Sequence, residues 1–259
     1  SVLSAYEKDF VHTFELASGL AEFMKTRREY GEFLRRLAAG YSNIGDYHRA
    51  FEALLAFSRH ASAERSLDED LVLESGAILT SNDRWIRQKS SELLVLAKRQ
   101  NDVELVKNLN QQLAGAGAEL AADKNWSRLA RFLEQFSDFD SESNLRLMLA
   151  DHYVEANELL PAQLVLCSIS SELSFEEQGR QRAILAQLLI KGKLFEQAAT
   201  LFHELNEDWA DTVVWRKLTG SELFDSVANN ASIRVAPSRH SLPIGKVFVD
   251  NAEDAGLNG

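Results

Sequence analysis

Apolar residues recur at three- and four-residue steps through residues 34–57, and a short polar stretch at 43–46 divides the run in two. This spacing places the apolar side chains on one face of a helix with about 3.6 residues per turn. Gly45 favours the left-handed conformation that ends a helix, and Asp46 favours the cap of the next one. Residues 34–57 therefore predict two helices joined by a tight turn.

The same spacing returns without gaps in residues 144–169 and 180–205. In each segment a small alanine on the first helix and another on the second allow two helix backbones to approach closely. The aligned positions are Leu37, Ala38, Tyr41, Gly45, Tyr47, Ala50, Leu54 and Phe57, then Leu149, Ala150, Tyr153, Asn157, Leu159, Ala162, Leu166 and Ile169, then Leu185, Ala186, Leu189, the nearby Gly192, Phe195, Ala198, Phe202 and Leu205. Ala162 and Ala198 are 36 residues apart, which is close to a helix-hairpin repeat of about 34 residues.

These hairpins resemble the tetratricopeptide repeat (TPR). The resemblance implies an all-α, TPR-like α-solenoid whose first helices line a concave surface that contacts a protein or peptide partner. The candidate protein-interaction residues on that surface are Arg35, Asn43, Asp151, Glu155, Gln187 and Lys191. Ala39 stands where TPR domains that clamp a peptide carboxylate need an asparagine, which argues against that kind of partner.

The segments between the clear hairpins interrupt this rhythm. Residues 61–83 have too little helical periodicity, and we expect an extended excursion near 66–83 with a short strand pair. Gly115 and Gly117 are expected to loosen residues 115–123. Further helices are predicted over residues 1–30, 84–98, 103–113 and 126–136.

The C-terminal part of the chain is β-prone. Residues 211–215 and 219–220 are expected to form a strand and a turn, and two further β-prone runs follow at 232–237 and 245–249. These two runs have no partner strand of comparable length, so we expect them to be extended and loosely held, or to pair with a domain outside this sequence. The predicted organisation is a helical-repeat domain at 1–206, an extended C-terminal segment at 207–250 and a disordered tail at 251–259.

A second resemblance concerns the order of segments. Residues 82–86 (NDRWI), 211–220 and 242–247 (LPIGKV) resemble the helical-repeat portion of large bacterial proteins that join TPR-like helices to a pyrroloquinoline-quinone-type β-propeller. The resemblance implies a propeller elsewhere in a longer protein and a role in assembly. No propeller-blade repeat occurs in this sequence.

Charge and cysteine content narrow the class of protein. The 259 residues carry 28 Lys and Arg against 39 Asp and Glu, a net charge of −11, so the chain is a poor candidate for binding nucleic acid. A single cysteine, Cys167, excludes an internal disulfide and is expected to pack as a small apolar residue. The sequence contains no run of 18 apolar residues, so no membrane helix is predicted. The sequence leaves open a cytoplasmic location or export without disulfides, and it leaves the oligomeric state open.

No catalytic, cofactor or metal site is predicted. The six histidines show no i,i+4 pair and no cysteine lies near them, so a zinc site is not expected. No phosphate loop and no paired nucleophile and base occur. The first hypothesis is a non-catalytic protein-interaction scaffold, as part of a larger protein. The alternatives are a helical enzyme or small-ligand protein with its site between residues 61–83 and the C-terminal segment, and self-assembly through that segment.

Overall fold

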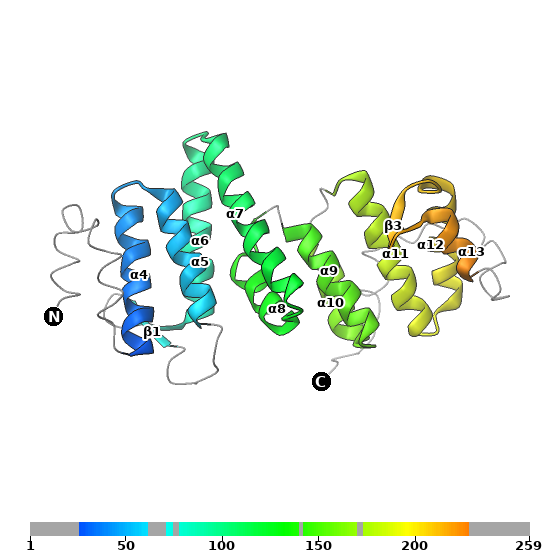
Figure 1. Ribbon diagram of the computed structural model, residues 1–259, viewed down its shortest axis with the longest axis horizontal. Helices are drawn as coiled ribbons and strands as arrows, with labels where there is room; N and C mark the ends of the chain where they lie inside the picture. The colour runs from blue at the N-terminus through cyan, green and yellow to red at the C-terminus, as the bar shows by residue number, and fades with distance from the viewer. Residues whose placement is uncertain (1–25, 62–70, 75–77, 140–141, 170–172, 228–259) are drawn as a thin grey trace, which may run out of the picture. The chain divides into compact units, whose positions relative to one another are not determined.

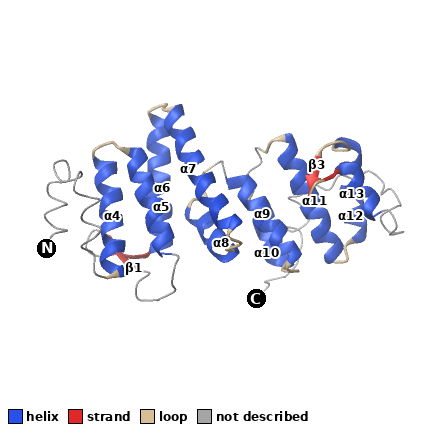
Figure 2. Cartoon of the chain, viewed as in Figure 1, coloured by secondary structure: helices blue, strands red, loops and turns tan. Residues whose placement is uncertain are grey.

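The computed structural model describes residues 26–61, 71–74, 78–139, 142–169 and 173–227 (Figure 1). The chain divides into two units, Ser1–Leu145 and Arg146–Gly259. Helices dominate the described residues, and the strands form only short pairs (Figure 2). The predicted all-α class is therefore confirmed.

The first unit contains five helices among its described residues, and a sixth begins at its end. Figure 1 shows α4 and α5 side by side as the first helix pair. The elements are α4 (Arg27–Asn43), α5 (Tyr47–Ala61), β1 (Leu71–Glu74), β2 (Ile78–Ser81), α6 (Asn82–Arg99), α7 (Val103–Ala122), α8 (Trp126–Gln135) and the start of α9 (Glu142–Glu155). β1 and β2 pair antiparallel, with Leu71 opposite Ser81, as expected for the excursion near 66–83.

The second unit continues from α9. Its further elements are α10 (Leu159–Cys167), α11 (Phe175–Lys191), α12 (Phe195–Asp208), β3 (Val213–Trp215), β4 (Leu218–Thr219) and α13 (Gly220–Val227). Residues 1–25 and 228–259, which hold one predicted helix and most of the C-terminal segment, lie outside the described residues.

Capping side chains explain where several helices begin. Thr26 Oγ1 accepts a hydrogen bond from the Glu29 backbone N–H at 3.2 Å, and Glu29 Oε2 accepts one from the Thr26 N–H at 3.0 Å. Ser174 and Glu177 form the same capping box before α11. Each box satisfies backbone N–H groups that have no partner inside the helix.

One turn geometry joins the two helices in five pairs of neighbouring helices, which are α4–α5, α6–α7, α7–α8, α9–α10 and α11–α12. The turn residue has a positive φ in each case, and the residue after it donates its N–H to a carbonyl five positions earlier, as in a Schellman motif. The turn residues are Gly45, Asn101, Lys124, Asn157 and Lys193, with φ of 80°, 54°, 54°, 61° and 62°. The corresponding N–H donors are Asp46, Asp102, Asn125, Glu158 and Leu194, at 2.8–3.1 Å from their acceptors. Corresponding positions in the hairpins can therefore be found by counting residues from each turn residue.

Small buried residues hold a fixed place relative to these turns. Ala38 and Ala50 lie seven residues before and five residues after Gly45, and both are at most 4% exposed. Ala150 and Ala162 hold the same places around Asn157, as do Ala186 and Ala198 around Lys193. Because all six are buried, the three predicted hairpins share one register of close helix contact.

A fourth hairpin with this register is formed by α7 and α8. Its turn residue is Lys124, so the two close-contact positions fall on Gly117 and Leu129, and both residues are buried. A Cβ at Gly117 would lie 2.2 Å from Leu145 Cδ1, which explains why glycine replaces alanine there. The expectation of a loosened segment at 115–123 is wrong, because α7 continues through Ala122.

The carboxyl end of α5 is held by arginines from other helices. Arg27 donates to the carbonyl of His60 at 2.7 Å, Arg128 to that of Arg59 at 3.1 Å, and Arg131 to that of Ala61 at 3.4 Å. Cations are favoured at this end of a helix, where backbone carbonyls lack partners. These bonds tie α4, α5 and α8 together.

Candidate functional site

The predicted interaction residues of the second unit lie at matching positions on two helices. Asp151 and Glu155 are one turn apart on α9, and Gln187 and Lys191 are one turn apart on α11. Lys191 Nζ donates to the backbone carbonyls of Val154 at 2.5 Å and Glu155 at 3.3 Å. The Lys191 side chain therefore contacts the backbone at the carboxyl end of α9, the helix that carries Asp151 and Glu155, while Gln187 lies half-buried on α11.

The β3–β4 hairpin reaches the same carboxylates. Trp215 Nε1 donates to Asp151 Oδ1 at 2.9 Å. The Arg216 guanidinium lies 3.5 Å from Asp151 Oδ1 and also forms an ion pair with Glu155. The centre of that guanidinium is 4.4 Å from the centroid of the Trp215 ring, within the range of a cation–π interaction. Two of the predicted interaction residues thus bind a segment of their own chain.

The tip of this hairpin has an unusual backbone. Trp215 pairs with Leu218, and the two residues between them, Arg216 and Lys217, have φ of 46° and 72°. A two-residue turn with both φ values positive normally carries Asn-Gly or similar residues. Residues with a Cβ cost free energy in this conformation, and the contacts of Arg216 with α9 help to offset that cost.

Close packing fixes the base of the hairpin. Val214 is 1% exposed and lies over α11 at Gly179, where a Cβ would be 2.8 Å from Val214 Cγ1 and 2.7 Å from Trp209 Cδ1. Trp209 Nε1 donates to the carbonyl of Phe175 at 2.8 Å. The strand and turn expected at 211–220 are present as a strand pair packed on α11 and α12, whereas the β-prone runs at 232–237 and 245–249 lie outside the described residues.

The predicted residues of the first unit have a different environment. Arg35 is half-buried on α4, with its guanidinium 6.0 Å from the centroid of the Phe57 ring. Desolvation lowers the pKa of Arg35 from its ordinary value, the nearby Arg36 and Arg28 lower it further, and Glu32 opposes the shift. Asn43 and Ala39 are exposed on the same helix. The side chains of α4 thus present amide, guanidinium and small apolar groups.

The remaining sequence-based expectations concern Cys167, metal binding, membrane helices and the alternative ligand site. Cys167 is exposed, so the expectation that it packs as a buried apolar residue is wrong. Within the described ranges no group of three or more His, Cys, Asp or Glu side chains is placed to hold a metal ion. No helix among those residues is both long enough and apolar enough to span a membrane. Much of the alternative ligand site, at 62–70, 75–77 and 228–250, lies outside the described residues.

We expect Asp151→Ala to cost more stability than Glu155→Ala. Asp151 accepts the Trp215 indole bond and faces Arg216, and losing such a hydrogen bond costs about 1–2 kcal/mol. The Glu155 carboxylate is half-exposed and forms an ion pair with the Arg216 guanidinium, a class of ion pair worth less than about 1 kcal/mol. Urea unfolding followed by circular dichroism measures both variants. Equal losses in the two variants would contradict this account of the hairpin contact.

The sequence pattern identified Asp151 and Glu155 as candidate interaction residues, but it did not predict that the β3–β4 hairpin contacts them. Two short β-prone runs separated by two residues are a signal for a hairpin, so the pairing of β3 with β4 could have been inferred. The contact of Trp215 with Asp151 spans 64 residues, and no local pattern marks it. Comparisons of this chain with protein-family models, with curated proteins and with solved structures find no match.

Proposed function

We propose that the chain is a non-catalytic protein-interaction scaffold built from TPR-like hairpins, and that the first helices of these hairpins bind a protein or peptide segment. The supporting observation is the contact of α9 with the β3–β4 hairpin. There, one hairpin's first helix holds a peptide segment by an indole hydrogen bond, an ion pair and apolar burial. The helices provide chemistry suited to recognising polypeptide.

The first helix α4 is the best candidate to bind a partner chain. Its residues Ala39 and Asn43 correspond to Asp151 and Glu155 when the turns at Gly45 and Asn157 are superposed in sequence. Both side chains are exposed, and Arg35 lies two turns before the end of the same helix. The β-propeller that the second resemblance implies would lie outside this chain and stays a prediction.

Affinity capture with matched baits tests this function. We expect the 259-residue chain, immobilised and exposed to lysate of its source cells, to retain a specific protein, and Asn43→Arg to lose at least nine-tenths of it. Gln111→Arg is the matched control, because Gln111 is also an exposed amide, on α7. Equal retention by both variants would exclude α4 as the binding surface. Retention of nothing beyond what an unrelated bait retains would contradict the scaffold function.

A further inference from the structure

α10 is apolar on almost every side, although one of its sides is exposed. From Leu159 to Cys167 its only polar side chain is Gln163. Ala162 and Leu166 face the core of the second unit, at 0% and 6% exposed. Leu160 and Leu164 are 65% and 62% exposed. Since they are four residues apart, they lie on one stripe of the helix, and the exposed Cys167 extends it.

The other hairpins show that the fold does not require these leucines. Counted from the turn residue of each hairpin, the places of Leu160 and Leu164 are filled by polar side chains in α5, α8 and α12. These are His48 and Glu52, Ser127 and Arg131, and Glu196 and Thr200. A helix that is apolar all round is normally buried, so the two leucines indicate a surface that is covered by another molecule.

We propose that the outward face of α10 binds the same face of a second copy of the chain, with the two helices antiparallel. No charged side chain occurs from Leu159 to Ser168. Arg146 of α9 places its guanidinium at the end of the stripe, where it donates to Ser168 Oγ at 2.8 Å. Two chains that each carry −11 meet with least repulsion through a helix face that has no acidic side chain. In the antiparallel arrangement Leu160 of each copy faces Leu164 of the other, which is a self-complementary, two-fold contact. The opposed helix dipoles also attract.

The size of the surface limits the strength of this dimer. A helix of nine residues is about 14 Å long at 1.5 Å per residue. A contact centred on it falls at the small end of specific interfaces, below about 1,200 Å² in total. The dimer is accordingly weak and forms at high protein concentration.

Analytical ultracentrifugation of the purified 259-residue chain, under reducing conditions that prevent disulfides through Cys167, tests the dimer. We expect the weight-average mass to rise from that of one chain towards that of two between about 10 µM and 1 mM, the range for weak interfaces. Leu160→Ser with Leu164→Ser is expected to raise the dissociation constant at least tenfold. Val103→Ser is the matched control, because Val103 is 76% exposed on α7, and we expect it to dimerise normally.

Pulse labelling of Cys167, the chain's one cysteine, gives a second measurement that locates the contact. With a maleimide in excess, the fraction of thiol labelled in a short pulse should fall as the chain concentration rises, and the double-serine variant should abolish that fall. Circular dichroism checks that the variant is folded. A mass that stays at one chain up to 1 mM would overturn dimerisation through α10, as would a dimer that the two serine substitutions leave unchanged. Because no other protein is present, neither result depends on the partner binding proposed for α4.

Discussion

Gly220→Ala is expected to destabilise the Arg146–Gly259 unit by roughly 3 kcal/mol, the upper part of the range for overpacking a buried site. A Cβ at Gly220 would lie 2.1 Å from the carbonyl oxygen of Leu205 and 2.5 Å from that of Trp209. Both atoms belong to the backbone at the end of α12, so neither can move aside by changing a rotamer. The Gly220 N–H also donates to the Trp209 carbonyl at 3.0 Å, and a shift that relieves the clash would break this bond.

Gly115→Ala is the matched control for this experiment. Gly115 lies inside α7, and a Cβ there would meet nothing within 4 Å. Alanine is the better helix former by up to about 1 kcal/mol, so this variant should be at least as stable as the native chain. Hydrogen exchange detected by mass spectrometry, in a urea series, assigns each loss to its segment. Native protection of residues 205–227 in Gly220→Ala would contradict the tight docking of α13 on α12.

Local patterns predicted the hairpins in which alanine fills both close-contact positions. Ala38 with Ala50, and Ala150 with Ala162, are separated by a turn residue, Gly45 or Asn157, that accepts a positive φ readily. In the third hairpin the sequence placed the turn near Gly192, but the residue with positive φ is Lys193, and Gly192 has φ of −75°. A glycine near a helix end therefore marks the turn without fixing which residue takes the left-handed conformation.

The sequence pattern did not reveal the α7–α8 hairpin, because its two close-contact positions carry a smaller and a larger residue in place of the two alanines. Gly117 leaves room for Leu145, and Leu129 provides the bulk that alanine lacks in the other hairpins. Each substitution alone breaks the alanine pattern, and only the turn at Lys124 reveals that they occupy corresponding positions. Intrinsic propensity also suggested a break at Gly115 and Gly117, but the packing of the whole helix outweighs the cost of two glycines.

The candidate site was predictable only in part, since its parts come from distant segments. Helical spacing correctly placed Asp151 and Glu155 one turn apart on α9. The guanidinium of Arg216, which pairs with both, comes from a hairpin that follows three more helices, α10, α11 and α12. Leu160 and Leu164 were part of an apolar run, and periodicity cannot tell an exposed leucine from a buried one when almost every side of the helix is apolar.

One helix face of the chain is covered by its own β3–β4 hairpin, whereas two others are exposed. The acidic face of α9 is taken by the β3–β4 hairpin, which stabilises the second unit from within. The faces that remain exposed, on α4 and α10, differ in chemistry. Asn43 and Arg35 carry hydrogen-bond donors, whereas Leu160 and Leu164 are apolar. We therefore expect changes to α4 to affect partner binding and changes to α10 to affect self-association, each without the other.

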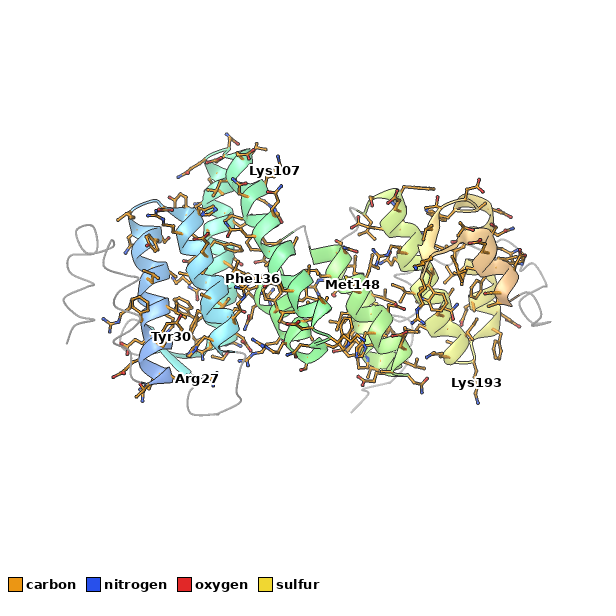
Figure 3. The ribbon with its side chains drawn as sticks, in the orientation of Figure 1. Arg27, Tyr30, Lys107, Phe136, Met148 and Lys193 are labelled. Carbon is orange, nitrogen blue, oxygen red and sulfur yellow. The ribbon has the colours of Figure 1, made fainter. Side chains whose placement is uncertain are left out.

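Phe51→Ala is expected to cost about 4 kcal/mol of the stability of the Ser1–Leu145 unit, as is typical for truncating a fully buried phenylalanine. The Phe51 ring is 0% exposed. Its centroid lies 5.7 Å from that of Phe136, in an edge-on arrangement, and 5.2 Å from that of Phe139. Phe136 is labelled within this unit in Figure 3. Removing Phe51 therefore leaves a cavity between α5 and the end of α8 and also removes two aromatic contacts, each worth about 0.5–1.5 kcal/mol.

Phe175→Ala removes the same side chain from an exposed place and is the control. Phe175 is 54% exposed and stacks on Trp209 at 5.0 Å, so its loss should cost less than about 1.5 kcal/mol. Urea unfolding with hydrogen exchange would show accelerated opening of α5 and α8 in Phe51→Ala and native protection there in Phe175→Ala. Equal losses of stability would mean that the Phe51–Phe136–Phe139 cluster does not hold α5 against α8. The register of the α4–α5 hairpin would then be fixed by the small-residue contacts at Ala38 and Ala50 alone.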